Sequence, residues 1–192
     1  MQQLFVSFYG LPIRSTVLLL FVSCGLWYLF LLAYNKFRRA HQLLCKFATA
    51  FLFTYWLIII LYNTVFPRSI GELIVHPDFF HQLKEYFFYD GDVELLRTLW
   101  MNVLLFVPGG LLLEALWPQR VPRWVRIPLT VIFLTALSVG IEATQYRYAL
   151  GVVEADDVLC NGLGAFLGAL IHEFALYCSA VWTTRHNSSI RK

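Results

Sequence analysis

Five apolar stretches, each long enough to cross a lipid bilayer as a helix, constrain this chain more than any other feature of its sequence. The hydrocarbon core of a bilayer is about 30 Å thick, and a helix crosses it with about 20 residues. The stretches cover residues 13–34, 43–66, 95–117, 124–145 and 157–182. Charged residues make up only 14% of the chain, whereas a soluble domain has about 25%. The sequence therefore predicts an all-α, polytopic integral membrane helical bundle with about five transmembrane helices.

Charge and cysteine content exclude several other classes of protein. The net charge of +3 is small, and no basic run alternates with aromatic residues, so no nucleic acid partner is expected. The four cysteines are scattered through apolar stretches without a CxxC motif, which favours packing residues over disulfides or metal ligands. No hydrolase or phosphate-binding motif is present, and His76, His81 and Glu85 lack further ligands for a zinc site. We expect no metal and no cofactor.

Basic residues predict how the helices are oriented. Ten of the 15 basic residues fall in the loops after the first and third stretches and in the C-terminal tail, Arg126 among them, whereas most acidic residues fall on the other side. Cytoplasmic loops of membrane proteins carry an excess of Lys and Arg. We therefore expect a multi-pass protein of a plasma membrane, with the N-terminus outside and the C-terminus in the cytoplasm.

Two segments depart from the plain pattern of spans. Residues 67–94 carry six acids, and their apolar residues recur at roughly helical spacing. This predicts one or two amphipathic helices on the outer surface. The third stretch contains Pro108-Gly109-Gly110, which predicts a break in that helix.

Polar residues of three predicted helices gather at the outer end. Asn102 lies in the opening turns of the third stretch, and Glu142 and Gln145 close the fourth. Asp157 and Asn161 open the fifth. Because residues three or four apart share a helix face, each pair faces one way. We predict that these five side chains form a ligand-binding site.

Simpler structural roles compete with this interpretation. Asp156 and Asp157 could cap the fifth helix or interact with its dipole. Asn161 could bond between helices, and Gly162, Gly164 and Gly168 could allow a close helix contact. His172 and Glu173 could form a local pair deep in the fifth helix.

Three blocks in order carry a family resemblance. They are NVLLFVPGG at 102–110, EATQ at 142–145 and GVVEADDVLCNGLGAFLG at 151–168. Together they resemble the VanZ-like membrane family over about residues 99–171. That family commonly has an arginine where this chain has Val152, and Arg147 could supply the charge instead.

The resemblance implies a bacterial plasma-membrane protein and a single VanZ-like transmembrane domain over residues 1–192. The family is named for a protein that gives low-level resistance to teicoplanin, a lipoglycopeptide that acts on cell-wall precursors at the outer membrane face. The expected partners are therefore membrane lipids and a lipoglycopeptide or a lipid-linked precursor. The oligomeric state and the ligand stay open.

Three functions are compatible with the polar residues. The first is a non-enzymatic protein that binds an amphiphile between its helices. The second is an intramembrane enzyme acting on a lipid-linked headgroup, with Glu142 or Asp157 as general base. The third is a lipid transporter or flippase, suggested by the expected break at Pro108.

Overall fold

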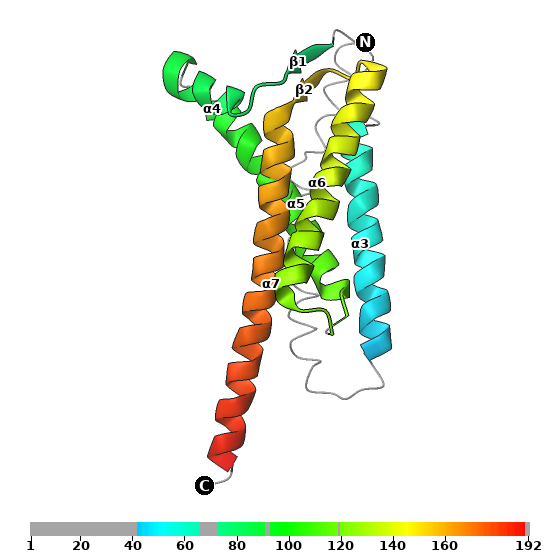
Figure 1. Ribbon diagram of the computed structural model, residues 1–192, viewed down its shortest axis with the longest axis vertical. Coiled ribbons are helices and arrows are strands. Elements are labelled where there is room, and N and C mark those ends of the chain that lie inside the picture. The colour runs from blue at the N-terminus through cyan, green and yellow to red at the C-terminus, as the bar shows by residue number, and fades with distance from the viewer. Residues whose placement is uncertain (1–41, 66–72, 91–92, 119, 191–192) are drawn as a thin grey trace, which may run out of the picture. The chain divides into compact units, whose positions relative to one another are not determined.

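The computed structural model describes residues 42–65, 73–90, 93–118 and 120–190 (Figure 1). The chain divides into two compact units, Met1–Cys45 and Lys46–Lys192, and almost all of the described residues belong to the second. The predicted span 13–34 lies outside the described residues, and the single domain over 1–192 stays a prediction.

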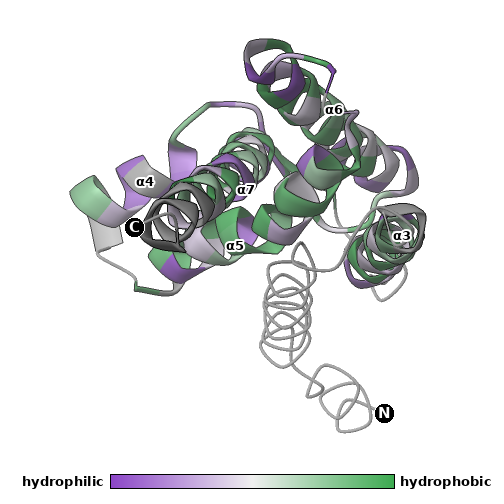
Figure 2. Ribbon diagram, turned by 90° about the horizontal axis from the view of Figure 1, so that it is seen from below, coloured by the Kyte–Doolittle hydropathy of each residue, from purple (hydrophilic) through white to green (hydrophobic). Residues whose placement is uncertain are grey.

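Four long helices confirm the other predicted spans. They are α3 (Gln42–Val65), α5 (Val93–Leu116), α6 (Arg123–Tyr148) and α7 (Ala155–Ile190). The parts long and apolar enough to cross a membrane are Cys45–Val65, Leu95–Leu116, Arg123–Tyr148 and Ala155–Trp182. Large apolar side chains also cover their outer faces, for example Phe51, Ile132 and Phe174, and Figure 2 shows hydrophobic residues around these helices. A helix that is apolar all round suits a lipid environment.

The helices α5 and α7 pack so closely that glycine is required between them. A Cβ added at Gly164 would overlap the carbonyl of Val103, and one at Gly168 would overlap that of Val107. Gly110 of α5 lies equally close to the carbonyl of Ala165. Small residues allow backbones in membranes to approach in this way. The expected close helix contact is therefore present.

The expected break at Pro108 is wrong, because α5 continues through it from Val93 to Leu116. Pro108 cannot donate a backbone hydrogen bond. The indole Nε1 of Trp56 donates to the neighbouring Leu105 carbonyl at 3.0 Å. The ring of Trp56 also fills the space that a side chain at Gly109 would need. Gly109 thus allows α3 to pack against a continuous helix.

Residues 73–90 are only partly helical. They form the strand β1 (Ile74–His76), the short helix α4 (His81–Glu85) and a π-helical turn, η2 (Tyr86–Asp90). β1 pairs in parallel with β2 (Val152–Glu154), with Ile74 opposite Val152 and His76 opposite Glu154. The expectation of helix throughout was wrong at β1, because β-branched residues in both segments favour extended pairing.

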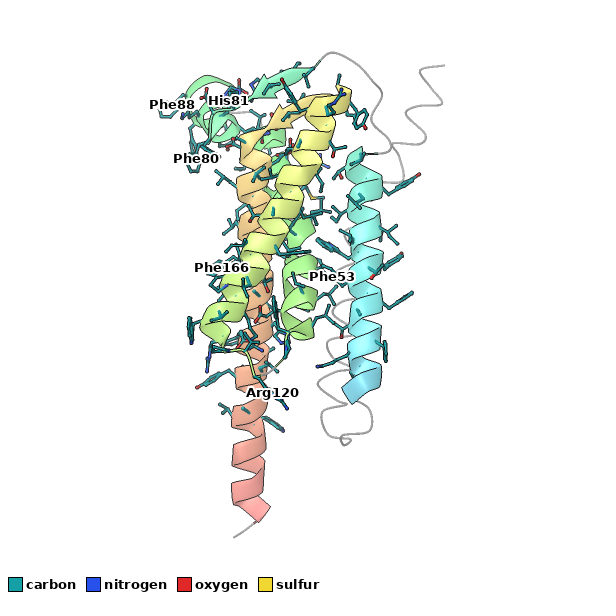
Figure 3. The ribbon with its side chains drawn as sticks, turned by 45° about the vertical axis from the view of Figure 1, so that its right-hand side comes forward. Phe53, Phe80, His81, Phe88, Arg120 and Phe166 are labelled. Atoms are coloured by element: carbon teal, nitrogen blue, oxygen red, sulfur yellow. The ribbon has the colours of Figure 1, made fainter. Side chains whose placement is uncertain are left out.

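The two strands mark one end of the four-helix unit. The N-terminal ends of α5 and α7 and the C-terminal end of α6 also lie there (Figure 1), and we call this the strand end. The connection from α5 to α6 lies at the other end, which we call the loop end. Figure 3 shows Phe80, His81 and Phe88 at the strand end and Arg120 at the loop end.

Candidate polar site at the strand end

The predicted site residues Asn102 and Asp157 are in direct contact between α5 and α7. The amide Nδ2 of Asn102 donates to Oδ1 of Asp157 at 2.5 Å. Both residues are partly buried. A hydrogen bond to an ionised group is worth about 1.5–3 kcal/mol. The contact therefore helps to hold the two closely packed helices in register at the strand end.

The other predicted residues bind different neighbours along one buried face of α6. Asn161 of α7 donates through Nδ2 to the hydroxyl of Ser138 at 2.8 Å. One turn further along α6, Oε2 of Glu142 accepts the backbone N–H of Glu154 at 3.2 Å. Gln145 donates to the Thr64 carbonyl of α3 at 2.9 Å. The five residues thus connect α3, α5, α6, α7 and β2 rather than converging on one atom.

Two of these amides keep a buried oxygen without a hydrogen-bond partner. They are Oε1 of Gln145, whose side chain is almost completely buried, and Oδ1 of Asn161. A buried amide oxygen left unpaired costs about 1–3 kcal/mol. These oxygens are acceptors that a water molecule or a ligand donor could satisfy.

Asp156 has a role that the sequence did not predict. Its Oδ2 accepts the backbone N–H of Gln82 at 2.9 Å, and its Oδ1 accepts that of Phe80. The carboxylate therefore caps the start of α4, although the sequence suggested a cap for its own helix. Phe80 has a φ of 62°, a conformation that non-glycine residues rarely adopt. The bond from its N–H holds that conformation.

Glu154 completes the connection between residues 73–90 and the bundle. Its Oε2 accepts a hydrogen bond from Nε2 of Gln82. Burial raises the pKa of the Glu154 carboxyl above its ordinary value, while His76 and the bond from Gln82 act in the opposite direction. The rings of His76 and His81 stack at 4.2 Å nearby, and Nε2 of His81 lies 3.5 Å from Glu85.

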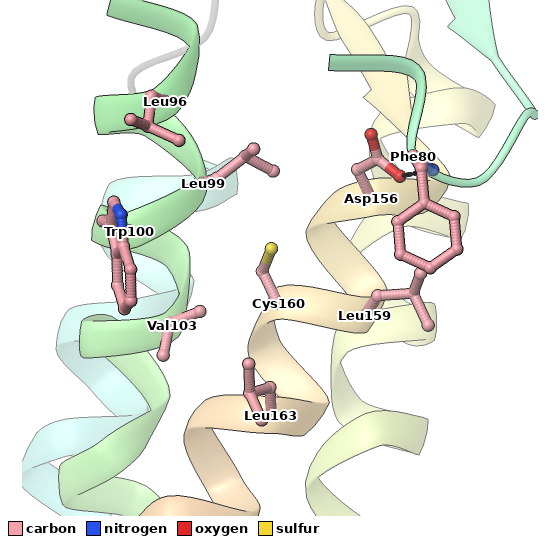
Figure 4. Close-up of a pocket in the computed structure, with 9 residues that line it drawn as sticks. All are labelled: Phe80, Leu96, Leu99, Trp100, Val103, Asp156, Leu159, Cys160 and Leu163. Carbon is pink, nitrogen blue, oxygen red and sulfur yellow. Dashed lines mark hydrogen bonds between the residues drawn. The ribbon is translucent and has the colours of Figure 1, made fainter. Parts of the chain in front are cut away.

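An apolar groove lies between α5 and α7 beside these polar contacts (Figure 4). Its volume is about 260 Å³. It is lined by Phe80, Leu96, Leu99, Trp100, Val103, Asp156, Leu159, Cys160 and Leu163. Asp156 is the one charged residue in this lining, and it lies at the strand end of the groove.

The carboxylates of this region all take part in hydrogen bonds. Glu142, Glu154, Asp156 and Asp157 each accept a hydrogen bond from an N–H group of the protein. Within the described residues, no three His, Cys, Asp or Glu side chains are grouped so that they could hold a metal ion. Val152, where the family commonly has arginine, lies in β2 opposite Ile74, and Arg147 is exposed in the last turn of α6.

Two charged residues at the loop end lie in different surroundings from those predicted. Arg126 is buried within α6, although it was counted among the basic residues of a loop. It contacts Glu114 of α5 and Glu173 of α7. Glu173 thus pairs with Arg126, whereas the sequence suggested a pair with the neighbouring His172.

Comparisons with known proteins bear on the family of this chain. Protein VanZ of Enterococcus faecium is 32% identical over 73 residues, which are 37% of this chain and 41% of that protein. The match thus spans less than half of the relative. No solved structure matches the chain significantly. The family described as VanZ/LLP1 matches residues 26–176, which are more than half of the chain. The chain therefore belongs to the VanZ/LLP1 family.

Proposed function

We propose that this protein binds an amphiphile at the strand end, and that this binding gives low-level resistance to lipoglycopeptides of the teicoplanin type. The amphiphile is a lipoglycopeptide or a lipid-linked cell-wall precursor. Its apolar tail occupies the groove between α5 and α7. Its polar part lies near Asn102, Glu142, Gln145, Asp157 and Asn161.

The groove is the observation that carries this proposal. It lies within the parts of α5 and α7 that are apolar enough to span a membrane, and apolar side chains form nearly all of its wall. Its volume of about 260 Å³ is slightly below the roughly 300–1,000 Å³ of pockets that enclose whole ligands. The groove therefore fits a single hydrocarbon tail and leaves the polar part of the ligand outside.

Two of the polar residues are neighbours in sequence of residues that line the groove. Asn102 lies between Trp100 and Val103, and Asp157 follows Asp156. The unpaired amide oxygens of Gln145 and Asn161 are acceptors for ligand N–H or O–H groups. A ligand donor would relieve the cost of leaving these oxygens unpaired.

The proposal places the strand end outside the cell. The N-terminus is then outside and the C-terminus cytoplasmic, as the basic residues predict. Arg126 contributes little to this charge asymmetry, because it is buried and paired with two carboxylates. The other nine basic residues on that side, in the loops after the first and third stretches and in the tail, support the orientation. A reporter enzyme active only in the cytoplasm, fused after Lys192, tests the orientation.

The functional test is growth inhibition of a susceptible Gram-positive host by teicoplanin and by vancomycin. The host expresses wild type or Leu163→Trp, which fills the groove, and membrane levels are measured. Leu170→Trp is the matched control, because Leu170 is similarly exposed on α7 but lies outside the groove. We expect protection against teicoplanin in wild type and the control, and loss of protection in Leu163→Trp.

The same assay with Glu142→Gln, Asp157→Asn and Asn161→Ala tests the polar residues. Partial loss in these variants supports a binding role, because the substitutions at Glu142 and Asp157 preserve shape. Unchanged protection in all three variants would mean that these polar residues have a structural role only. No protection from well-expressed wild type, or equal protection by Leu163→Trp, would overturn the proposal.

A further inference from the structure

A second polar cluster joins three helices toward the loop end, away from the groove. Nε of Arg126 on α6 lies 3.2 Å from Oε1 of Glu114 on α5. Nη2 of Arg126 lies 2.5 Å from Oε1 of Glu173 on α7. The side chain of Glu114 is completely buried, and those of Arg126 and Glu173 are 5% and 14% exposed. All three residues lie within the membrane-spanning parts of their helices.

Hydrogen bonds fix the orientation of the Glu114 carboxyl. The hydroxyl of Thr130 donates to its Oε2 at 2.8 Å. The same hydroxyl accepts the indole N–H of Trp117 at 3.0 Å. Since a hydroxyl has one proton, the bond from Trp117 leaves that proton directed at Glu114. The oxygen Oε1 of Glu114 has no hydrogen-bond partner of its own.

The charges of this cluster do not balance. Two carboxylates and one guanidinium sum to one negative charge, and arginine does not lose its proton in proteins. An uncompensated charge is costly in a membrane-spanning bundle, so a buried group binds or releases a proton instead. One additional proton makes the cluster neutral.

His172 lies beside this cluster but is a poor position for the additional proton. It is 6% exposed, and neither of its ring nitrogens has a hydrogen-bond partner. It precedes Glu173 in α7, and the positive charge of Arg126 opposes a second positive charge on its ring. Burial also opposes a charge on this ring. One of the two carboxyls is therefore the better position for the additional proton.

A hollow at the surface of the bundle reaches the cluster beside Arg123, the first residue of α6. Its volume is about 230 Å³. Its lining consists of Arg123, Glu173, Leu176, Tyr177 and Ala180. Glu173 thus belongs both to the hollow and to the ionic cluster. The guanidinium of Arg126 lies between the carboxyl of Glu173 and the carboxyl of Glu114.

We propose that Glu114, Arg126 and Glu173 form a proton-binding site inside the membrane-spanning bundle. The site holds one proton in its neutral state. This proton enters from water at the hollow beside Glu173 and returns there. Because the same side chains connect α5, α6 and α7, loss of the proton weakens the contact among these helices. The site lies apart from the groove and does not depend on the ligand proposed above.

Infrared difference spectroscopy of the full chain in lipid nanodiscs at neutral pH tests this site. A carboxylic acid that keeps its proton has a C=O stretching band that a carboxylate lacks. We expect this band in wild type and its loss in Glu114→Gln or in Glu173→Gln. Glu154→Gln is the matched control, because Glu154 is a partly buried acid outside the cluster, and it should keep the band.

Each other outcome contradicts the proposal. Absence of the band from wild type means that both carboxyls are ionised, and this result needs no variant to fold. Loss of the band in Glu154→Gln alone assigns the proton to the strand end. Stabilisation of wild type by sodium, with no band, replaces the proton with a bound cation.

Discussion

Replacing Asp156 by alanine should release residues 78–90 from the bundle while the four long helices stay folded. The carboxylate is 3% exposed, and it accepts the backbone N–H groups of Phe80 and Gln82. Alanine removes both acceptors. The two N–H groups then either remain buried without partners or reach water when the segment detaches, and detachment satisfies them.

The expected size of this effect follows from the two bonds. A hydrogen bond to a charged group contributes about 1.5–3 kcal/mol, so the two together contribute about 3–6 kcal/mol. Since about 1.4 kcal/mol corresponds to a factor of ten in an equilibrium constant, the open state of the segment should become at least about a hundredfold more populated. Asparagine keeps one acceptor oxygen without the charge, and Asp156→Asn should therefore give an intermediate effect.

Amide hydrogen exchange of the protein in nanodiscs measures this opening directly. Peptides covering residues 78–90 should exchange faster in Asp156→Ala, whereas peptides from the centres of α5 and α7 should exchange at the wild-type rate. Asp78→Asn is the control, because Asp78 is an exposed acid of the same segment. Wild-type protection of residues 78–90 in Asp156→Ala would refute the reasoning. Faster exchange throughout α5 and α7 would show that Asp156 supports the whole bundle.

Three further predictions concern stability. Gly168→Leu should lower the temperature of unfolding by separating α5 from α7, whereas Gly140→Ala, where an added Cβ meets open space, should not; thermal unfolding of both in detergent tests this. Arg126→Gln should cost about 3–5 kcal/mol, because it leaves two buried carboxyls without their cation, and reversible unfolding in SDS measures that cost. The raised pKa of Glu154 means that the folded state binds its proton more tightly than the unfolded state. The stability from this group is therefore present below its ordinary pKa and is lost as pH rises through the raised value. Glu154→Gln should abolish this loss in a pH series of unfolding temperatures, and an unchanged pH dependence would count against it.

The spans could be predicted because a bilayer leaves the backbone few choices. A segment in hydrocarbon must satisfy its own N–H and C=O groups, so a long apolar run becomes a helix. The predicted ranges 95–117 and 157–182 correspond closely to Leu95–Leu116 and Ala155–Trp182. The glycines of α7 were also read correctly, because small residues in a membrane helix have few other uses.

The strand pair and the role of Asp156 could not be predicted from the chain alone. Each strand has three residues, too few for a pattern of alternation, and its partner lies more than 70 residues away in sequence. Asp156 looked like a cap for its own helix, since acids are common in a first turn. Only the path of residues 73–90 brought the N–H groups of Phe80 and Gln82 to its carboxylate.

The sequence by itself determined the helices, the faces on which Glu142, Gln145, Asp157 and Asn161 lie, and the continuous apolar surface that suits a bilayer. Helical periodicity and hydropathy are local properties, and they suffice for these features. The tertiary structure decided which faces meet. It paired Asn102 with Asp157, directed Asn161 to Ser138 and Gln145 to Thr64, and enclosed Arg126 between Glu114 and Glu173. The rotation of each helix about its axis sets these contacts, and that rotation depends on how all the helices pack together.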